Sequence, residues 1–129
     1  SPSKTYPYPV INETRINLKN ERNWDVVWEA MRSVISNNEG TGYRFGRNAP
    51  YSVAAKTGTA QVFSGRQYVG ARYEDIPELL RDHSFFIAFA PVESPEIAIA
   101  VMLENDAVAS VVARQVLDAY FAKNAQKAL

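Results

Sequence analysis

The stretch Tyr51-Ser-Val-Ala-Ala-Lys-Thr-Gly-Thr59 is the most informative part of this chain. Turn-forming residues fill the segments 39–42 and 46–50 before it, so 51–59 is predicted to be a short β-strand that starts after a loop. Side chains alternate along a strand, which places Lys56 and Gly58 on the same face. The missing side chain of Gly58 leaves space for another molecule to reach the lysine, so bulk at position 58 is expected to close the site.

The residues Lys56 to Thr59 suit the binding of an anion. Thr57 and Thr59 present hydroxyl groups that can donate hydrogen bonds to a carboxylate. Lys56 adds a positive field that favours an anion in a partly dry cleft. We therefore predict that Lys56, Thr57, Gly58 and Thr59 bind a substrate and do not attack it.

The spacing of apolar residues predicts four further elements. The runs 83–90 and 96–104 are dense in Phe, Ile and Val and flank a proline-bounded turn, which is typical of an antiparallel hairpin. Apolar residues at intervals of three and four predict helices over 24–35 and 109–123. The predicted fold class is α/β, with a three-stranded antiparallel sheet covered on one face by both helices.

The strand 96–104 has two different faces. Its larger apolar side chains point one way, namely those of Ile97, Ile99, Val101 and Leu103. Ala98, Ala100 and Met102 point the other way. Small side chains let a helix approach closely, so the helix 109–123 is expected to cover the face of Ala98 and Ala100.

Composition argues against several classes of function. The chain has 129 residues, of which 47% are hydrophobic, which is enough for one small folded domain. Its 14 Lys and Arg residues are balanced by 14 Asp and Glu residues, so no nucleic-acid partner is expected. The longest apolar run, 97–103, is far too short to cross a bilayer. A chain with no cysteine and one histidine cannot build a structural zinc site, and no cofactor motif is present.

Two polar features have ordinary structural interpretations. His83 stands beside Ser84, but neighbouring strand residues face opposite ways, so a packing histidine is favoured over a catalytic one. The polar stretch 61–82 carries Arg66, Arg72 and Arg81. It is either a solvated loop or, because it follows the strand 51–59, one border of a substrate cleft.

From Trp24 to Phe121 the chain resembles the C-terminal part of a class B penicillin-binding protein transpeptidase domain, nearest to the elongation-specific type. The resemblance rests on three stretches: Ala54-Ala-Lys-Thr-Gly-Thr-Ala-Gln-Val62, Leu80-Arg-Asp-His-Ser-Phe-Phe-Ile-Ala-Phe-Ala-Pro91 and Ile97-Ala-Ile-Ala-Val-Met-Leu-Glu-Asn105. The Lys-Thr-Gly triplet is one of the signatures of penicillin-recognising serine enzymes. The resemblance implies the fold shared by penicillin-binding proteins and serine β-lactamases.

By this resemblance, the strand of Lys56 lines an active site in which Thr57 and Thr59 bind the carboxylate of a peptide or a β-lactam. The main-chain amide of Thr59 supplies half of the oxyanion hole, a donor typically worth ~2.7–4 kcal/mol of transition-state stabilisation. The implied activity is peptidoglycan D,D-transpeptidation through an acyl-serine intermediate, on a D-Ala-D-Ala stem peptide. The implied partners are this peptide, β-lactam antibiotics and the cell-wall elongation machinery, at the periplasmic face of a bacterial inner membrane.

No convincing nucleophile is present. Ser1-Pro-Ser-Lys4 matches the Ser-x-x-Lys pattern literally, but its prolines prevent the helix that the motif requires, and Ser36-Asn-Asn38 lies too close to Lys56 for the Ser-x-Asn loop. We therefore expect a linker or cut end at residues 1–20 and the C-terminal portion of a transpeptidase domain at 21–129. The nucleophile is expected on the remaining N-terminal part of that domain or on another chain, so this piece alone should not acylate.

Two alternatives to the transpeptidase remain open. The missing nucleophile fits a non-catalytic binding or assembly module, in which the Lys56 triplet is only a turn and an apolar sheet face docks a partner. A serine β-lactamase shares the triplet and differs in the residues that activate a deacylating water. The coding sequence upstream of Ser1 distinguishes the binding module from the transpeptidase, because only the transpeptidase requires a Ser-x-x-Lys helix there.

Overall fold

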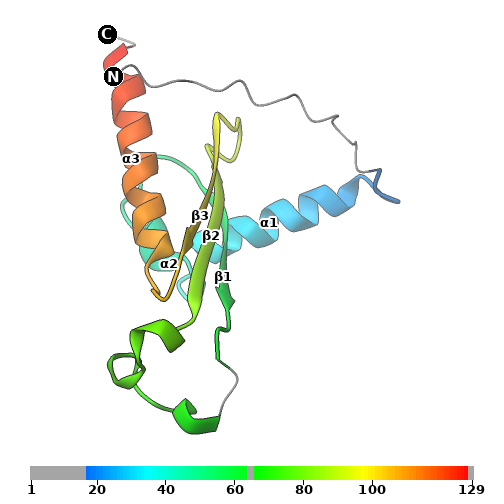
Figure 1. The fold of residues 1–129 in the computed structure, drawn as a ribbon. Coiled ribbons are helices and arrows are strands. Elements are labelled where there is room, and N and C mark those ends of the chain that lie inside the picture. Colours follow the sequence, from blue (N-terminus) through cyan, green and yellow to red (C-terminus); the bar gives the residue numbers. More distant parts are fainter. Residues whose placement is uncertain (1–16, 64–65, 128–129) are drawn as a thin grey trace, which may run out of the picture.

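The computed structural model of the protein describes residues 17–63 and 66–127 (Figure 1). It contains three strands, β1 (Ala54–Ala60), β2 (His83–Ala90) and β3 (Ile97–Leu103), and three α-helices, α1 (Arg22–Ser36), α2 (Tyr43–Gly46) and α3 (Ala109–Lys127). Three short 3-10 helices, at 66–68, 73–75 and 78–80, lie between β1 and β2. The predicted α/β class is confirmed. Most of the predicted linker 1–20, including Ser1-Pro-Ser-Lys4, lies outside the described residues.

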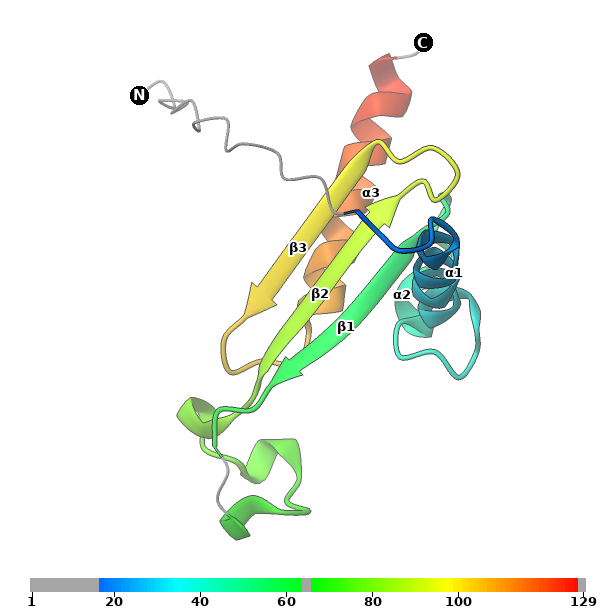
Figure 2. The ribbon, with the colours of Figure 1, turned by 90° about the vertical axis from the view of Figure 1, so that its right-hand side faces the viewer.

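The sheet has the order β1-β2-β3, and both neighbouring pairs are antiparallel (Figure 2). The register places Lys56 opposite Ile87 and Gly58 opposite Phe85. β1 begins at Ala54 and not at Tyr51 as predicted. Just before β1, the Ser52 hydroxyl accepts a hydrogen bond from the Val92 amide at 2.9 Å, so a side chain and not the strand ladder ties this residue to the β2–β3 turn.

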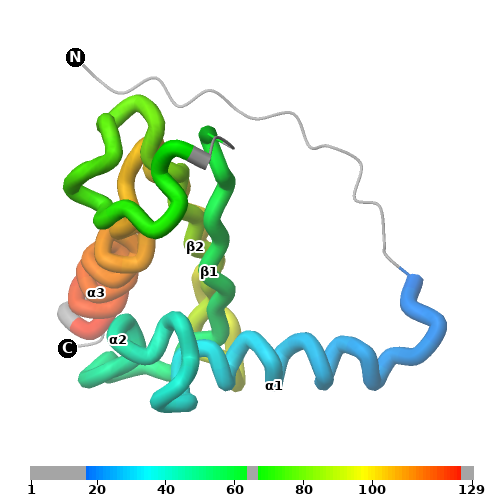
Figure 3. Tube along the Cα trace, turned by 90° about the horizontal axis from the view of Figure 1, so that it is seen from below, coloured from blue at the N-terminus to red at the C-terminus, as the bar shows by residue number. Residues whose placement is uncertain are grey.

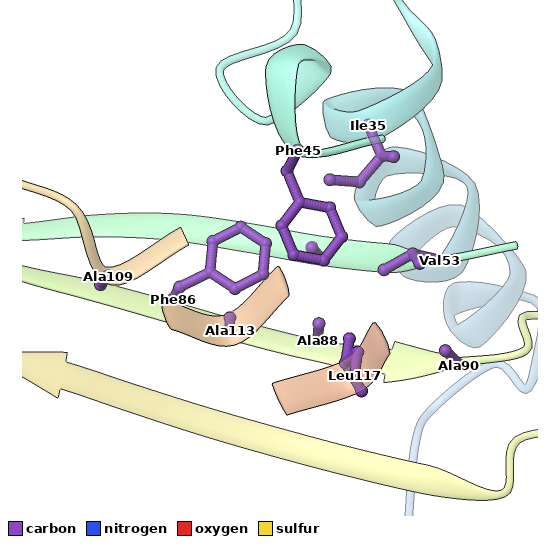
Figure 4. Packing of buried hydrophobic residues seen from close by; sticks show 10 residues of the cluster. Ile35, Phe45, Val53, Phe86, Ala88, Ala90, Ala109, Ala113 and Leu117 are labelled. Carbon is purple, nitrogen blue, oxygen red and sulfur yellow. The ribbon is translucent and has the colours of Figure 1, made fainter. Parts of the chain in front are cut away.

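The core lies on one face of the sheet, which we call the core face, beneath α3. Phe86 and Leu117 are fully buried there, and the close approach of helix to sheet depends on alanines of both elements (Figure 4). The small residues concerned are Ala88 and Ala90 on β2 and Ala109 and Ala113 on α3. Fully burying one large apolar side chain is worth about 1.5–3 kcal/mol, so this layer is the main source of stability in the described fold.

The expectation for the two faces of β3 is wrong. α3 covers the face of Ile97, Ile99, Val101 and Leu103, and Ala98, Ala100 and Met102 are exposed. The reason is the register of β3 on β2, which aligns Ile99 with Ala88 and Val101 with Phe86. The small side chains that admit the helix are on β2, so the larger residues of β3 can flank it.

The two long helices do not cover the same face, which corrects a second expectation. Figures 2 and 3 show α3 behind the sheet and α1 passing the β1 edge and leaving on the other side. The C-terminal Ile35 of α1 is buried in the core, but the Trp28 ring packs on Phe89, which points to the opposite face, with 5.6 Å between centroids. Trp24 and Val27 are exposed, so only the last turn of α1 serves the core.

A polar cluster fastens α3 to the loop before β1. The Tyr51 hydroxyl donates a hydrogen bond to Asp118 at 2.6 Å, and Arg114 Nε donates to both carboxylate oxygens of Asp118 at 2.8 Å. The Arg114 guanidinium also donates to the carbonyl oxygens of Phe45, Arg47 and Asn48. Burial together with the hydrogen bond to Asp118 raises the pKa of Tyr51. Burial acts to raise the pKa of Asp118 as well, but the hydrogen bonds from Tyr51 and Arg114 outweigh it and hold that pKa below its usual value.

The Asp118 carboxylate should make the stability of the fold depend on acid pH. Its folded pKa lies below that of an unfolded aspartate, about 3.9, so its contribution is complete above about pH 5 and is lost as pH falls through the folded pKa. Asp118→Asn is therefore expected to lower the free energy of unfolding at pH 7. The decrease of this free energy between pH 5 and pH 3, measured by urea denaturation, should be smaller in the variant than in the parent. Glu29→Gln, at an exposed position in the middle of α1, is the control and should change the free energy of unfolding by no more than about 0.5 kcal/mol at either pH. An unaltered acid profile for Asp118→Asn would contradict this assignment.

Candidate functional site

The predicted site residues lie along β1, which is an edge strand among the described residues. The face opposite the core face, called the outer face here, carries Lys56 and Gly58, and the core face carries Thr57 and Thr59. Thr57 is half-buried, and the other three are exposed. The four residues therefore surround a strand edge whose main-chain N–H and C=O groups have no neighbouring strand in the described chain.

Gly58 is not required by the backbone conformation. Its φ is not positive, since Gly70 is the only described glycine in the left-handed region. A Cβ at Gly58 would lie 3.2 Å from the Cβ of Phe85, its cross-strand neighbour, and would meet no other residue within 4 Å. The glycine thus keeps the outer face beside Lys56 free of a side chain, and a side chain at position 58 would press on Phe85.

The Lys56 charge is available to an anion. Its ammonium group donates a hydrogen bond to the Thr57 carbonyl oxygen at 2.6 Å. Among the described residues no carboxylate forms an ion pair with it, because the ion pairs present are those of Arg72 and Arg114. An exposed, unneutralised lysine beside two hydroxyl-bearing residues can attract and hold a carboxylate.

Sequence reasoning missed one residue next to this strand. The hydroxyl oxygens of Thr41 and Thr57 are 2.9 Å apart, which makes a hydrogen bond between the α1–α2 loop and β1. The Gly-Thr-Gly segment around Thr41 by itself predicts only a turn. The glycines on either side of Thr41 were the available signal, because they mark a place where main chain packs closely.

A cavity of about 390 Å³ adjoins the C-terminal half of β1. Thr57, Gly58 and Thr59 line it together with the segment between β1 and β2 and the N-terminal end of α3. Arg81 lies in this wall, where its guanidinium stacks 4.7 Å from the Tyr73 ring centre and donates a hydrogen bond to the Ile76 carbonyl at 3.0 Å. Of the two interpretations of the arginine-bearing stretch, Arg81 fits the border of a cleft. Arg72 pairs with Glu74 and Asp75 instead.

The polar groups next to this cavity have structural partners. His83 Nδ1 accepts a hydrogen bond from the Asn105 amide at 2.9 Å, and Asn105 Nδ2 donates to the Arg81 carbonyl at 2.9 Å. The Ser84 hydroxyl accepts from the Ala109 amide at 3.2 Å and so caps the start of α3. His83 and Ser84 therefore serve different contacts, as predicted for neighbouring strand residues. No group of three His, Cys, Asp or Glu side chains within 17–63 and 66–127 is placed to hold a metal ion.

Comparison with known proteins places the chain in a family. The family model of the penicillin binding protein transpeptidase domain matches residues 9–122. The chain belongs to this family. The match includes every strand of the described sheet and α3 up to residue 122, and it confirms the resemblance drawn from the Lys56 triplet and the hairpin sequences.

Individual relatives agree with the family. Peptidoglycan D,D-transpeptidase MrdA of Salmonella typhimurium is 45% identical over 102 residues, which are 76% of this chain and 16% of that protein. The crystal structure of Pseudomonas aeruginosa PBP2 in complex with WCK 5153 matches with a TM-score of 0.63 and 37% identity, over 81% of this chain and 20% of that one. Helicobacter pylori PBP2 in its complex with MreC matches with a TM-score of 0.62 and 25% identity, over 78% and 18%.

The chain spans only about one sixth of the length of the curated MrdA relatives, 16% of the Salmonella protein. It is homologous to MrdA over most of its own length and corresponds to part of a transpeptidase domain. Within the described ranges, no helix combines the length and the apolar character that a membrane span requires.

Proposed function

We propose that this chain forms the substrate-anchoring wall of a peptidoglycan D,D-transpeptidase active site. The observation that carries the proposal is the arrangement on β1. Within 17–63 and 66–127, Lys56 has no ion-pair partner and β1 is an edge strand, and Gly58 and two threonine hydroxyls lie along the same edge. Thr57 and Thr59 bind the carboxylate of the D-Ala-D-Ala stem peptide, and the Thr59 amide donates to the developing oxyanion. The homology to MrdA supports the reaction assigned.

The nucleophile belongs, in this proposal, to a preceding part of the same domain, with residues 21–129 as its C-terminal portion. The outer face of the sheet supports this division. It is apolar, and no helix crosses in front of β2 and β3 in Figure 2. Its members are Phe85, Ile87, Phe89, Ala98, Ala100 and Met102, next to Trp28 of α1. A contiguous apolar face beside the site is expected to be covered by more protein.

A polar substitution on the outer face tests this packing. Met102 is 49% exposed in the described fold, so Met102→Glu would cost little if the face stayed in water. In the full-length protein we expect a loss on the order of 3 kcal/mol, because the carboxylate would be buried without a partner. Leu79→Glu, at a position that is 81% exposed in the segment before β2, is the control and should stay within about 0.5 kcal/mol. Equally small losses in chemical denaturation would show that the face stays in solvent.

The acyl-enzyme test addresses the reaction itself. The full-length protein is incubated with benzylpenicillin, its intact mass is measured, and any adduct is located by peptide mapping. We expect one penicilloyl group on a serine upstream of Ser1, because within this sequence only Ser1 has a lysine three positions later and Pro2 follows it at once. Absence of any adduct would favour the binding module. Rapid hydrolysis of the adduct would favour a β-lactamase.

The proposed partners follow from the relatives. The Helicobacter relative forms a complex with MreC and the Pseudomonas relative is seen with WCK 5153. For this protein we propose the stem peptide and β-lactams as ligands, the cell-wall elongation machinery as protein partner, and the periplasmic face of the inner membrane as location. The proposed chemistry uses no cofactor, since an acyl-serine mechanism needs only side chains and main-chain donors.

A further inference from the structure

We propose that Thr41 is a positioning residue that directs the Thr57 hydroxyl toward the substrate carboxylate. The inference rests on the proposed carboxylate-binding function of Thr57. Its starting point is the 2.9 Å contact between the two hydroxyl oxygens, which joins residues 16 positions apart in the sequence. Thr41 does not touch the ligand in this proposal and acts only through Thr57.

The loop holds Thr41 firmly enough for this role. The amide of Gly40 donates to the Asn37 carbonyl at 2.9 Å, and the amide of Gly42 donates to the Val34 carbonyl at 3.0 Å. A Cβ at Gly40 would lie 2.3 Å from the Val34 carbonyl oxygen, so main chain packs directly on main chain there. Thr41 is thus the one side chain between two glycines pressed against the end of α1.

The packing continues into the core. A Cβ at Gly42 would lie 2.6 Å from Ile35 Cδ1, and Ile35 is itself a buried member of the core. The position of the Thr41 hydroxyl is therefore set by the same contacts that seat α1 on the sheet. A polar group placed by a packed scaffold keeps its geometry better than one on a loosely held loop.

The number of hydrogens on each hydroxyl decides which threonine must donate when a ligand is bound. Each threonine hydroxyl has one hydrogen to donate and can accept two, and an ionised carboxylate only accepts. When Thr57 donates to a carboxylate, the Thr41–Thr57 bond requires Thr41 as the donor. Thr41 then fixes the Thr57 rotamer and polarises its O–H group toward the ligand. Without a ligand, either hydroxyl is able to donate.

The test measures the second-order rate of benzylpenicillin acylation in the full-length protein. Thr41→Val and Thr41→Ala are expected to lower the rate about threefold to tenfold, the range of one neutral hydrogen bond. Thr41→Ser keeps the donor and should restore the rate. Thr57→Val should slow acylation at least as much, and adding Thr41→Val to Thr57→Val should cause no further loss, because the path through Thr57 is already gone. Melting temperatures accompany each variant.

The outcomes separate this inference from the proposed function. If Thr57→Val slows acylation but the Thr41 variants do not, Thr41 has no positioning role and the substrate-anchoring proposal stands. If Thr57→Val has no effect, the carboxylate assignment itself fails. Losses that add in the double variant, or that Thr41→Ser does not restore, would mean that Thr41 acts through the fold and not through Thr57, and would overturn the inference.

Discussion

Replacing Gly58 with valine is expected to slow benzylpenicillin acylation of the full-length protein about 100-fold, equivalent to about 2.7 kcal/mol of activation free energy. Gly58 adopts an ordinary strand conformation, so valine is compatible with its backbone. The added carbons would occupy the space beside Lys56 through which the proposed substrate approaches. The nearest atom to the new Cβ is the Phe85 Cβ at 3.2 Å, which must shift by a few tenths of an ångström, so the stability of the variant is measured beside its acylation rate.

Ala60→Val is the matched control for Gly58→Val. Ala60 lies on the same face of β1, two residues beyond Gly58 and opposite His83. Ala60→Val therefore introduces the same branched side chain outside the Lys-Thr-Gly triplet. We expect its acylation rate to stay within about twofold of the parent, well below the tenfold that corresponds to about 1.4 kcal/mol. If Gly58→Val is acylated at the parental rate and remains folded, the space beside Lys56 is not the route of the substrate.

Replacing Phe86 with alanine is expected to lower the free energy of unfolding by about 3–5 kcal/mol. Phe86 is completely buried in the centre of β2, and its ring packs on Phe45 with 4.8 Å between centroids. The loss combines the transfer free energy of the ring with the cavity left between the sheet and α3. Phe86 also pairs with Thr57 in the sheet register, so the variant should acylate poorly as well.

Urea denaturation measures the effect of Phe86→Ala, read as a shift of the midpoint at constant slope. Phe63→Ala is the control, because Phe63 is 38% exposed and its described ring contact is with Tyr68. We expect it to cost about 1 kcal/mol or less. Similar losses for the two phenylalanines would contradict the placement of the core beneath α3.

Local sequence patterns were sufficient to predict the three strands of the sheet and the two long helices. The alternation in 83–90 and 96–104 and the proline-bounded turn between them predict a hairpin without reference to any other part of the chain. The Lys56 triplet at the end of a strand led to the family, and the family match bears this out. The shared face of Lys56 and Gly58 also followed from alternation alone.

The packing of the helices was not accessible to the same reasoning. The side of β3 that α3 covers depends on β2. Phe86 and Ala88 of β2 point into the core beneath α3, and the residues of β3 that pair with them, Val101 and Ile99, face the same way. The sequence of β3 alone predicts that α3 packs on the small residues Ala98 and Ala100. Similarly, the apolar stripe of α1 predicted a helix but not that only Ile35 would be buried.

Sequence by itself determined the strands, the two long helices and the family, because periodicity and short motifs are properties of neighbouring residues. The ligand-binding role of the residues on β1 stays a prediction. Tertiary structure alone decided which sheet face is buried, that β1 lies at the edge of the sheet formed by the described residues, and that Thr41 contacts Thr57. These depend on contacts between residues far apart in the chain, where burial summed over several elements selects one arrangement from many that satisfy the local patterns.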